Sequence, residues 1–189
     1  KYSADLYVNL EKETGVSTGV KQNGSLTVAL TENRHEEILR QASIAKSFEV
    51  DVNEISISEL KSYHPFLNVD GVKGAVHLPL DGQGDPANIA MALAKGARDL
   101  GVKIFEDTKV TGLNTHNNSV SGIYWMNKDG KGLIKTENAA NCAGMWARDF
   151  AESQGVTVPL HACEHFYIVT EPVKNLSTLP VLRMPDEQT

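Results

Sequence analysis

The stretch from residue 85 to residue 137 most constrains the fold, because one helical pattern is followed by several β patterns. Apolar residues repeat at helical spacing between Asp85, a candidate N-cap, and Gly101, a candidate stop. VKIFE then predicts a strand, and three β runs joined by short turns follow over residues 110–137. An antiparallel meander inserted into a chain of otherwise alternating helices and strands predicts a mixed fold, α/β with α+β character.

The rest of the chain supplies that alternation. Helices are predicted over residues 2–15, 31–50 and 56–65. Strands are predicted as a hairpin around Asn23-Gly24, an extended run over 72–81 and a long strand over 158–172. Between the meander and that long strand, residues 137–155 predict a strand, a glycine turn and a helix.

Composition excludes some classes of function. The chain has 189 residues and a net charge of −6, which disfavours a general nucleic-acid or anionic-membrane surface. No apolar run approaches the roughly 20 residues of a membrane helix. Two cysteines, Cys142 and Cys163, are too few for a disulfide framework and are expected to be reduced. The chain starts without methionine inside a helical pattern, so we expect an internal fragment of a longer protein.

Two glycine-containing motifs precede helices. In AANCAGMWA, small residues at the turn would let backbone amides approach a ligand, although a tight turn that merely packs explains the pattern as well. DGQGDP matches neither a phosphate-binding loop nor a dinucleotide fingerprint, and a capped turn is its ordinary interpretation.

The histidines form no tight metal constellation. His161, Cys163 and His165 alternate along one predicted strand, but adjacent strand positions rarely supply three ligands, so we expect no metal site. His165 stands at the start of the apolar run FYIV. From this stretch alone it is either a working residue or a polar group that orders a sheet.

Several motifs in order carry a family resemblance: LEKETG, KQNGSL, LNVDGVKGAVHLPLDGQGDP, MALAKGARDLGVKI, NCAGMWA and HFYIVTEP followed by LPVLR. With them the chain resembles, nearly end to end, the flavin-dependent amine dehydrogenases that demethylate sarcosine and dimethylglycine. These enzymes belong to the D-amino-acid-oxidase-like flavoprotein superfamily.

The resemblance implies a partial Rossmann-like FAD-binding layer joined to a substrate domain with an antiparallel sheet, with the chain crossing between them. Residues 1–16 would end a flavin-domain helix and residues 17–81 would begin the substrate domain. Residues 82–158 would return to the FAD-binding domain, and residues 159–189 would re-enter the substrate domain. The family's glycine-rich pyrophosphate turn, active-site tyrosine and folate domain lie outside the chain, so we expect residues 1–189 alone to be inactive and to retain no FAD.

The same resemblance implies site residues. Val110 would contact the adenine end of FAD through its backbone, and Ala143, Gly144 and Trp146 would be FAD neighbours. His165 would be catalytic, taking the proton of an N-methyl amino acid so that its methyl group can lose a hydride to FAD. Tetrahydrofolate would meet the product only where a folate domain exists. The compartment would be the mitochondrial matrix in a eukaryote and the cytoplasm in a bacterium.

Two alternatives stay open. A D-amino-acid oxidase, glycine oxidase or glycerol-3-phosphate dehydrogenase relative would want an arginine clamp or a basic cluster, and neither Arg148 nor Arg183 stands in an obvious one. A flavoprotein-derived scaffold that binds a partner without redox work is the other.

Overall fold

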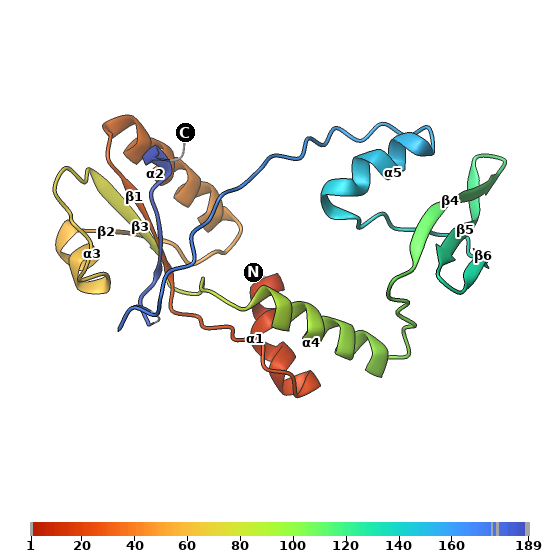
Figure 1. Ribbon diagram of the computed structural model, residues 1–189. Helices are drawn as coiled ribbons and strands as arrows, with labels where there is room; N and C mark the ends of the chain where they lie inside the picture. Colours follow the sequence, from red (N-terminus) through yellow and green to blue (C-terminus); the bar gives the residue numbers. More distant parts are fainter. Residues whose placement is uncertain (1, 175, 177, 188–189) are drawn as a thin grey trace. The chain divides into compact units, whose positions relative to one another are not determined.

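The computed structural model describes residues 2–174, 176 and 178–187. The chain divides into two compact units (Figure 1). The first unit consists of residues 1–103 and 170–189, and the second consists of residues 104–169. Together they contain a mixed sheet and an antiparallel sheet, which confirms the predicted fold class. The assignment of segments to a flavin domain and a substrate domain stays a prediction.

The first unit is built on a four-stranded sheet in the order β2-β3-β1-β7. Its strands are β1 (Ser25–Ala29), β2 (Asn53–Ile55), β3 (Gly74–Leu78) and β7 (Val181–Arg183). The central strand β1 pairs antiparallel with β3 and parallel with β7, and β2 pairs antiparallel with β3. The prediction of an extended run over residues 72–81 is therefore confirmed.

Helices cover both faces of this sheet. Successive side chains of a strand point to opposite sides, so both faces carry apolar side chains against which a helix can pack. On one face, α3 (Ile57–Tyr63) inserts Leu60 against Leu26 and Val28, all three fully buried. On the other, α2 (Glu32–Ser47) packs Ile38 and Ala42 against Ala29 and Val76. The remaining helices of this unit, α1 (Tyr2–Thr14) and α4 (Pro86–Asp99), pack against each other.

The predicted helix starts are confirmed by their side-chain caps. Thr31 accepts a hydrogen bond from the Arg34 N–H of α2 at 3.2 Å. Ser56 and Glu59 form a reciprocal capping box on α3. Asp85 accepts from the N–H groups of Ala87 and Asn88 at the start of α4. Such bonds satisfy backbone donors that the first helical turn leaves free.

Two segments join α1 and α4 to the sheet, and we call them the double strap: residues 18–24 and residues 81–85. They run antiparallel, with Lys21 and Gln83 exchanging backbone hydrogen bonds of 2.8 and 3.1 Å. Gly24 N–H donates to the Asp81 carbonyl at 2.9 Å. The predicted hairpin around Asn23-Gly24 is therefore wrong, because the segment before Gly24 pairs with this distant stretch and the segment after it becomes β1.

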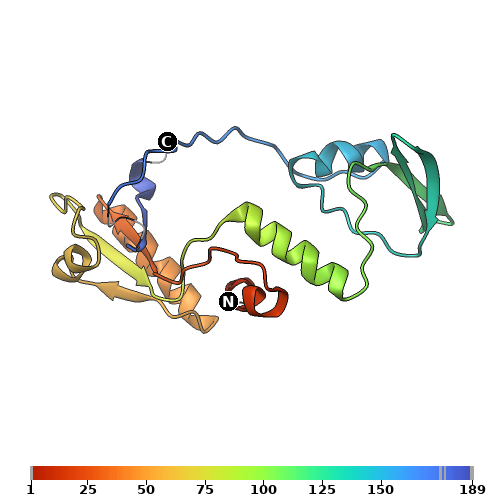
Figure 2. The same cartoon turned by 60° about the horizontal axis from the view of Figure 1, so that its bottom comes forward.

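The second unit is the predicted meander followed by a turn and a helix. Strands β4 (Lys109–His116), β5 (Ser119–Asn127) and β6 (Gly130–Lys135) pair antiparallel in that order. Asn117 and Asn118 both have positive φ (49° and 58°), as the tight turn between β4 and β5 requires. After the meander come the 3₁₀ turn η1 (Gly144–Trp146) and α5 (Ala147–Ser153), which lies beside the sheet (Figure 2).

Three predicted strands are wrong. Residues 102–106, the segment before NCAG, and residues 158–172 belong to no strand. A correctly predicted helix or strand adjoins each of these segments. The error therefore lies in the expected strand pairing and not in the position of the neighbouring elements. A segment becomes a strand only when its N–H and C=O groups bond to a neighbouring strand, and these three segments pair with none among the described residues.

None of the helices in the described part of the chain combines the length and apolar character needed to cross a membrane. The short 3₁₀ turn η2 (Pro185–Glu187) closes the described part of the first unit. Its Asp186 carboxylate accepts hydrogen bonds from the Leu30 N–H at 2.8 Å and from Thr31 and Arg34, and so holds this segment against the start of α2.

Candidate functional site

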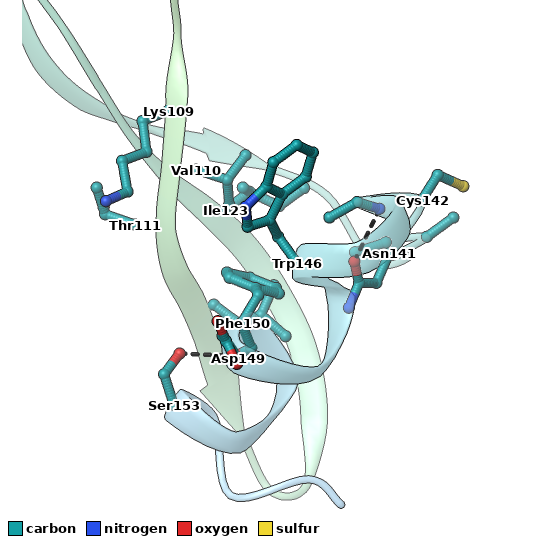
Figure 3. A pocket seen from close by; sticks show the side chains of 14 residues that line it. Lys109, Val110, Thr111, Ile123, Asn141, Cys142, Trp146, Asp149, Phe150 and Ser153 are labelled. Atoms are coloured by element: carbon teal, nitrogen blue, oxygen red, sulfur yellow. Dashed lines mark hydrogen bonds between the residues drawn. The ribbon is translucent and has the colours of Figure 1, made fainter. Parts of the chain in front are cut away.

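The second unit contains a cavity of about 870 Å³ between the meander and the turn that leads into α5 (Figure 3). This volume is in the range of small-molecule and cofactor pockets, about 300–1,000 Å³. The lining is mostly apolar with a few polar groups. It comprises Lys109, Val110, Thr111, Leu113, Ile123, Ala139, Ala140, Asn141, Cys142, Ala143, Trp146, Asp149, Phe150 and Ser153.

The first wall is strand β4, which is an edge strand of its sheet. Its pairing with β5 shifts between Val110 and Gly112, so Thr111 has no residue opposite it. An edge strand has N–H and C=O groups that form no hydrogen bond to a neighbouring strand. A bulge in such a strand changes the direction of the side chains beside it. Val110, which precedes the irregularity, and Thr111, the unpaired residue itself, both line the cavity.

The second wall is one face of α5 and the turn before it. Trp146, Phe150 and Ser153 follow at helical spacing, which places them on one side of the helix. Figure 3 shows Trp146 and Phe150 on the side that faces β4. Trp146 remains 66% exposed, so most of its ring surface is available to a ligand.

Asn141 fixes the turn that joins these walls. Its Nδ2 donates to the Ala147 carbonyl at 2.9 Å, and its Oδ1 accepts from the Ala143 N–H at 3.2 Å. The residues around it in the lining, Ala139, Ala140, Cys142 and Ala143, all have small side chains. The turn therefore has a defined shape without any bulky group to fill the space in front of it.

Charge in and around the cavity is modest. Lys109 and Asp149 are the charged members of the lining. Arg148 does not line the cavity. Its Nε forms an ion pair with Glu152 at 2.7 Å, and its Nη1 donates a hydrogen bond to the Leu160 carbonyl at 3.3 Å. The hydrogen bond to Glu152, and then its charge, raise the pKa of Arg148 above its usual value. This guanidinium is engaged with the helix surface rather than with the cavity.

The structure brings three of the predicted site residues together. Val110, Ala143 and Trp146 line the same cavity, and Gly144 lies between the last two in the η1 turn. His165 does not join them. It lies in an exposed segment without regular structure, next to Phe166 and Tyr167, which are 91% and 86% exposed.

Several lining residues were not anticipated from the sequence. Phe150 stands four residues after Trp146, and that helical spacing was a usable signal. Thr111 enters the cavity beside a pairing irregularity for which the sequence gives no sign. Within the described residues, no three His, Cys, Asp or Glu side chains converge as metal ligands would.

The fold is that of FAD-dependent oxidoreductases. L-proline dehydrogenase from P. horikoshii superimposes with a TM-score of 0.79 and 27% sequence identity, over 97% of this chain and 48% of that chain. The family model for FAD dependent oxidoreductases, DAO, matches residues 1–189, and the chain belongs to this family.

Curated relatives agree with this assignment. Mitochondrial sarcosine dehydrogenase from Homo sapiens is 36% identical over 182 residues, which cover 94% of this chain and 19% of that protein. The mitochondrial pyruvate dehydrogenase phosphatase regulatory subunit from Mus musculus is 36% identical over 173 residues, covering 90% of this chain and 19% of that protein. The chain thus spans about a fifth of the length of these relatives.

Proposed function

We propose that the chain is part of an amine dehydrogenase that oxidises the N-methyl group of sarcosine or dimethylglycine with FAD. The observation that carries this proposal is the convergence of Val110, Ala143 and Trp146 on one apolar cavity. The 36% identity to sarcosine dehydrogenase supports the substrate class.

The cavity residues fit the adenosine end of FAD. An aromatic ring at Trp146, apolar walls and the accessible edge of β4 suit a flat base that needs both stacking and backbone hydrogen bonds. The Val110 backbone would hold the base, and the alanine-rich turn would let the chain approach the sugar closely. FAD, when bound, supplies the acceptor for a hydride.

His165 would handle the substrate proton. An ammonium group has no lone pair to help expel a hydride from the adjacent methyl carbon, so the amine must be neutral. A neutral histidine ring nitrogen is a base and can accept the proton from the amine nitrogen. The iminium product would then be hydrolysed to formaldehyde, or meet tetrahydrofolate in a protein that has a folate domain. The mitochondrial relatives support a mitochondrial location, which we propose to be the matrix, for a eukaryotic protein.

A substrate screen tests this function in the full-length polypeptide that contains the chain. Under anaerobic conditions, sarcosine and dimethylglycine should bleach the visible absorbance of the bound flavin. D-alanine, glycine, L-proline and glycerol 3-phosphate should not. Bleaching by one of these four alone would replace our proposal by the corresponding rival oxidoreductase.

The relative named as a phosphatase regulatory subunit favours a second candidate, a non-catalytic flavoprotein-derived scaffold. The same screen separates the two. A polypeptide that binds FAD, yet shows no bleaching with any of these donors, would support the scaffold.

Thiol footprinting tests the cavity independently of turnover. Cys142 lines the cavity and Cys163 does not, while both are exposed and free. FAD added to the flavin-free polypeptide should slow the reaction of Cys142 with iodoacetamide and leave Cys163 unchanged as the internal control. Equal rates at Cys142 with and without bound FAD would place the cofactor elsewhere.

A further inference from the structure

Gln154, the residue that follows α5, connects the helix to strand β4. Its Oε1 accepts a hydrogen bond from the Leu113 N–H at 2.8 Å, across 41 positions of sequence. Its Nε2 donates to Ser153 Oγ at 2.8 Å, and Ser153 Oγ in turn donates to the Phe150 carbonyl at 2.6 Å. A continuous set of hydrogen bonds therefore runs from the edge strand into the helix.

Gly112 lies directly beside this contact, so that a Cβ atom alone would just touch the amide and a larger side chain would press on it. A Cβ atom at position 112 would lie 3.4 Å from Gln154 Oε1 and 3.6 Å from Nε2. The glycine also stands at the pairing irregularity of β4, immediately before the Leu113 N–H that the amide binds. The strand and the glutamine thus meet at the point where β4 departs from regular pairing.

This contact joins the two walls of the cavity described above. β4 supplies Val110 and Thr111, and α5 with its preceding turn supplies Trp146 and Phe150. Gln154 itself is half-buried and is not among the residues that line the cavity. Its effect on a ligand must therefore act through the separation of the walls.

We propose that Gln154 is a positioning residue for the cofactor: its amide oxygen sets the distance between β4 and α5, and thereby the fit of the adenosine end of FAD. The inference rests on the proposed function, since it concerns the same cavity. Because a single hydrogen bond makes a modest net contribution, loss of the acceptor is expected to weaken FAD binding by up to about tenfold.

Three variants of the full-length polypeptide test the proposal by FAD titration. Gln154→Met has similar length but no amide acceptor, and it should weaken FAD binding and reduce the protection of Cys142 from iodoacetamide. Gln154→Glu keeps an oxygen acceptor and should retain both. Valine is favourable in a strand, but in Gly112→Val its side chain should push the Gln154 amide away from β4. This variant should therefore reproduce the effect of Gln154→Met.

Trp146→Ala serves as the reference for the cavity, and thermal unfolding verifies that every variant is folded. If Trp146→Ala weakens FAD binding but Gln154→Met and Gly112→Val do not, the positioning role is overturned and the proposed function stands. The positioning role also fails if Gln154→Glu behaves like Gln154→Met. If the wild-type polypeptide binds no FAD, or Trp146→Ala has no effect, the cofactor cavity itself is overturned.

Discussion

His165 carries the proposed proton transfer, so its replacement should affect chemistry more than folding. The imidazole is exposed and has no close packing to lose. His165→Ala in the full-length polypeptide should raise KM and slow flavin reduction by about 10²-fold or more, the usual contribution of a general base. Stopped-flow reduction by sarcosine under anaerobic conditions measures this effect.

The pH profile provides the second readout for His165. The variant should also lose the acid limb of the rate profile, because that limb reports protonation of the base. His161→Ala, four residues earlier in the same exposed segment, is the matched control and should react like the wild type. Unchanged reduction kinetics in His165→Ala would reject the catalytic role.

Asp186 gives the first unit a dependence on pH. The Leu30 N–H, followed by Thr31 and Arg34, stabilises the carboxylate and lowers the pKa of Asp186 below its usual value. A depressed folded pKa means that the stabilisation is present above the unfolded pKa, about 3.9, and is lost as the pH falls through the folded value. Asp186→Asn should therefore lower the unfolding temperature at pH 7.

Acidification supplies the check on Asp186. The difference between Asp186→Asn and the wild type should shrink as the pH falls below about 3.9, where the unfolded carboxyl takes up a proton, and should be lost only below the lowered folded pKa. Thermal melts at several pH values, recorded on residues 1–189, measure this convergence. A difference that stays constant from pH 7 to pH 3 would show that the carboxylate charge contributes nothing.

The double strap depends on a glycine at position 82. A Cβ atom there would lie 2.0 Å from the Lys21 carbonyl oxygen and 3.0 Å from the Gln22 Cα, and backbone atoms cannot move aside cheaply. Gly82→Ala should therefore destabilise the first unit by about 3 kcal/mol, at the upper end of overpacking costs. Chemical denaturation measures the loss.

Gly112→Ala is the control for this experiment, since its added Cβ would make only ordinary contacts of 3.4 Å or more. It should change the unfolding free energy far less than Gly82→Ala. Equal losses in the two variants would mean that glycine removal itself, rather than the close approach of the two segments, is responsible.

Local signals explain which elements the sequence could predict. The caps at Thr31, Ser56 and Asp85 need only neighbouring residues, and all three form as expected. Strands need a distant partner, which is why the runs at 102–106 and 158–172 were mistaken for strands. The Gln154–Leu113 bond, formed across 41 positions, had no sequence signal for the same reason.

At the scale of the whole molecule, the candidate site also combines features that the sequence indicates with features that depend on contacts between distant residues. Family resemblance placed Val110, Ala143 and Trp146 at the cofactor, and the structure brings them to one cavity. Resemblance could not supply the shape of that cavity, which depends on the irregular pairing of β4 and on the bonds made by Asn141. The grouping of these three residues could therefore be anticipated from the sequence, whereas the geometry of the cavity could not, and their contact with the cofactor stays a prediction.

The last prediction concerns how tightly residues 1–189 alone bind FAD, since the cavity would contact only one end of the cofactor. We propose that the walls of the cavity hold the adenosine end, and the chain spans about a fifth of the sarcosine dehydrogenase length. A dinucleotide gains affinity along its whole length, so contacts to one end should give weak, readily reversible binding. A protein made of residues 1–189 alone should lose its flavin absorbance on desalting, whereas the full-length polypeptide treated identically should keep it. Stoichiometric FAD retained by residues 1–189 would show that this segment already contains the complete cofactor site.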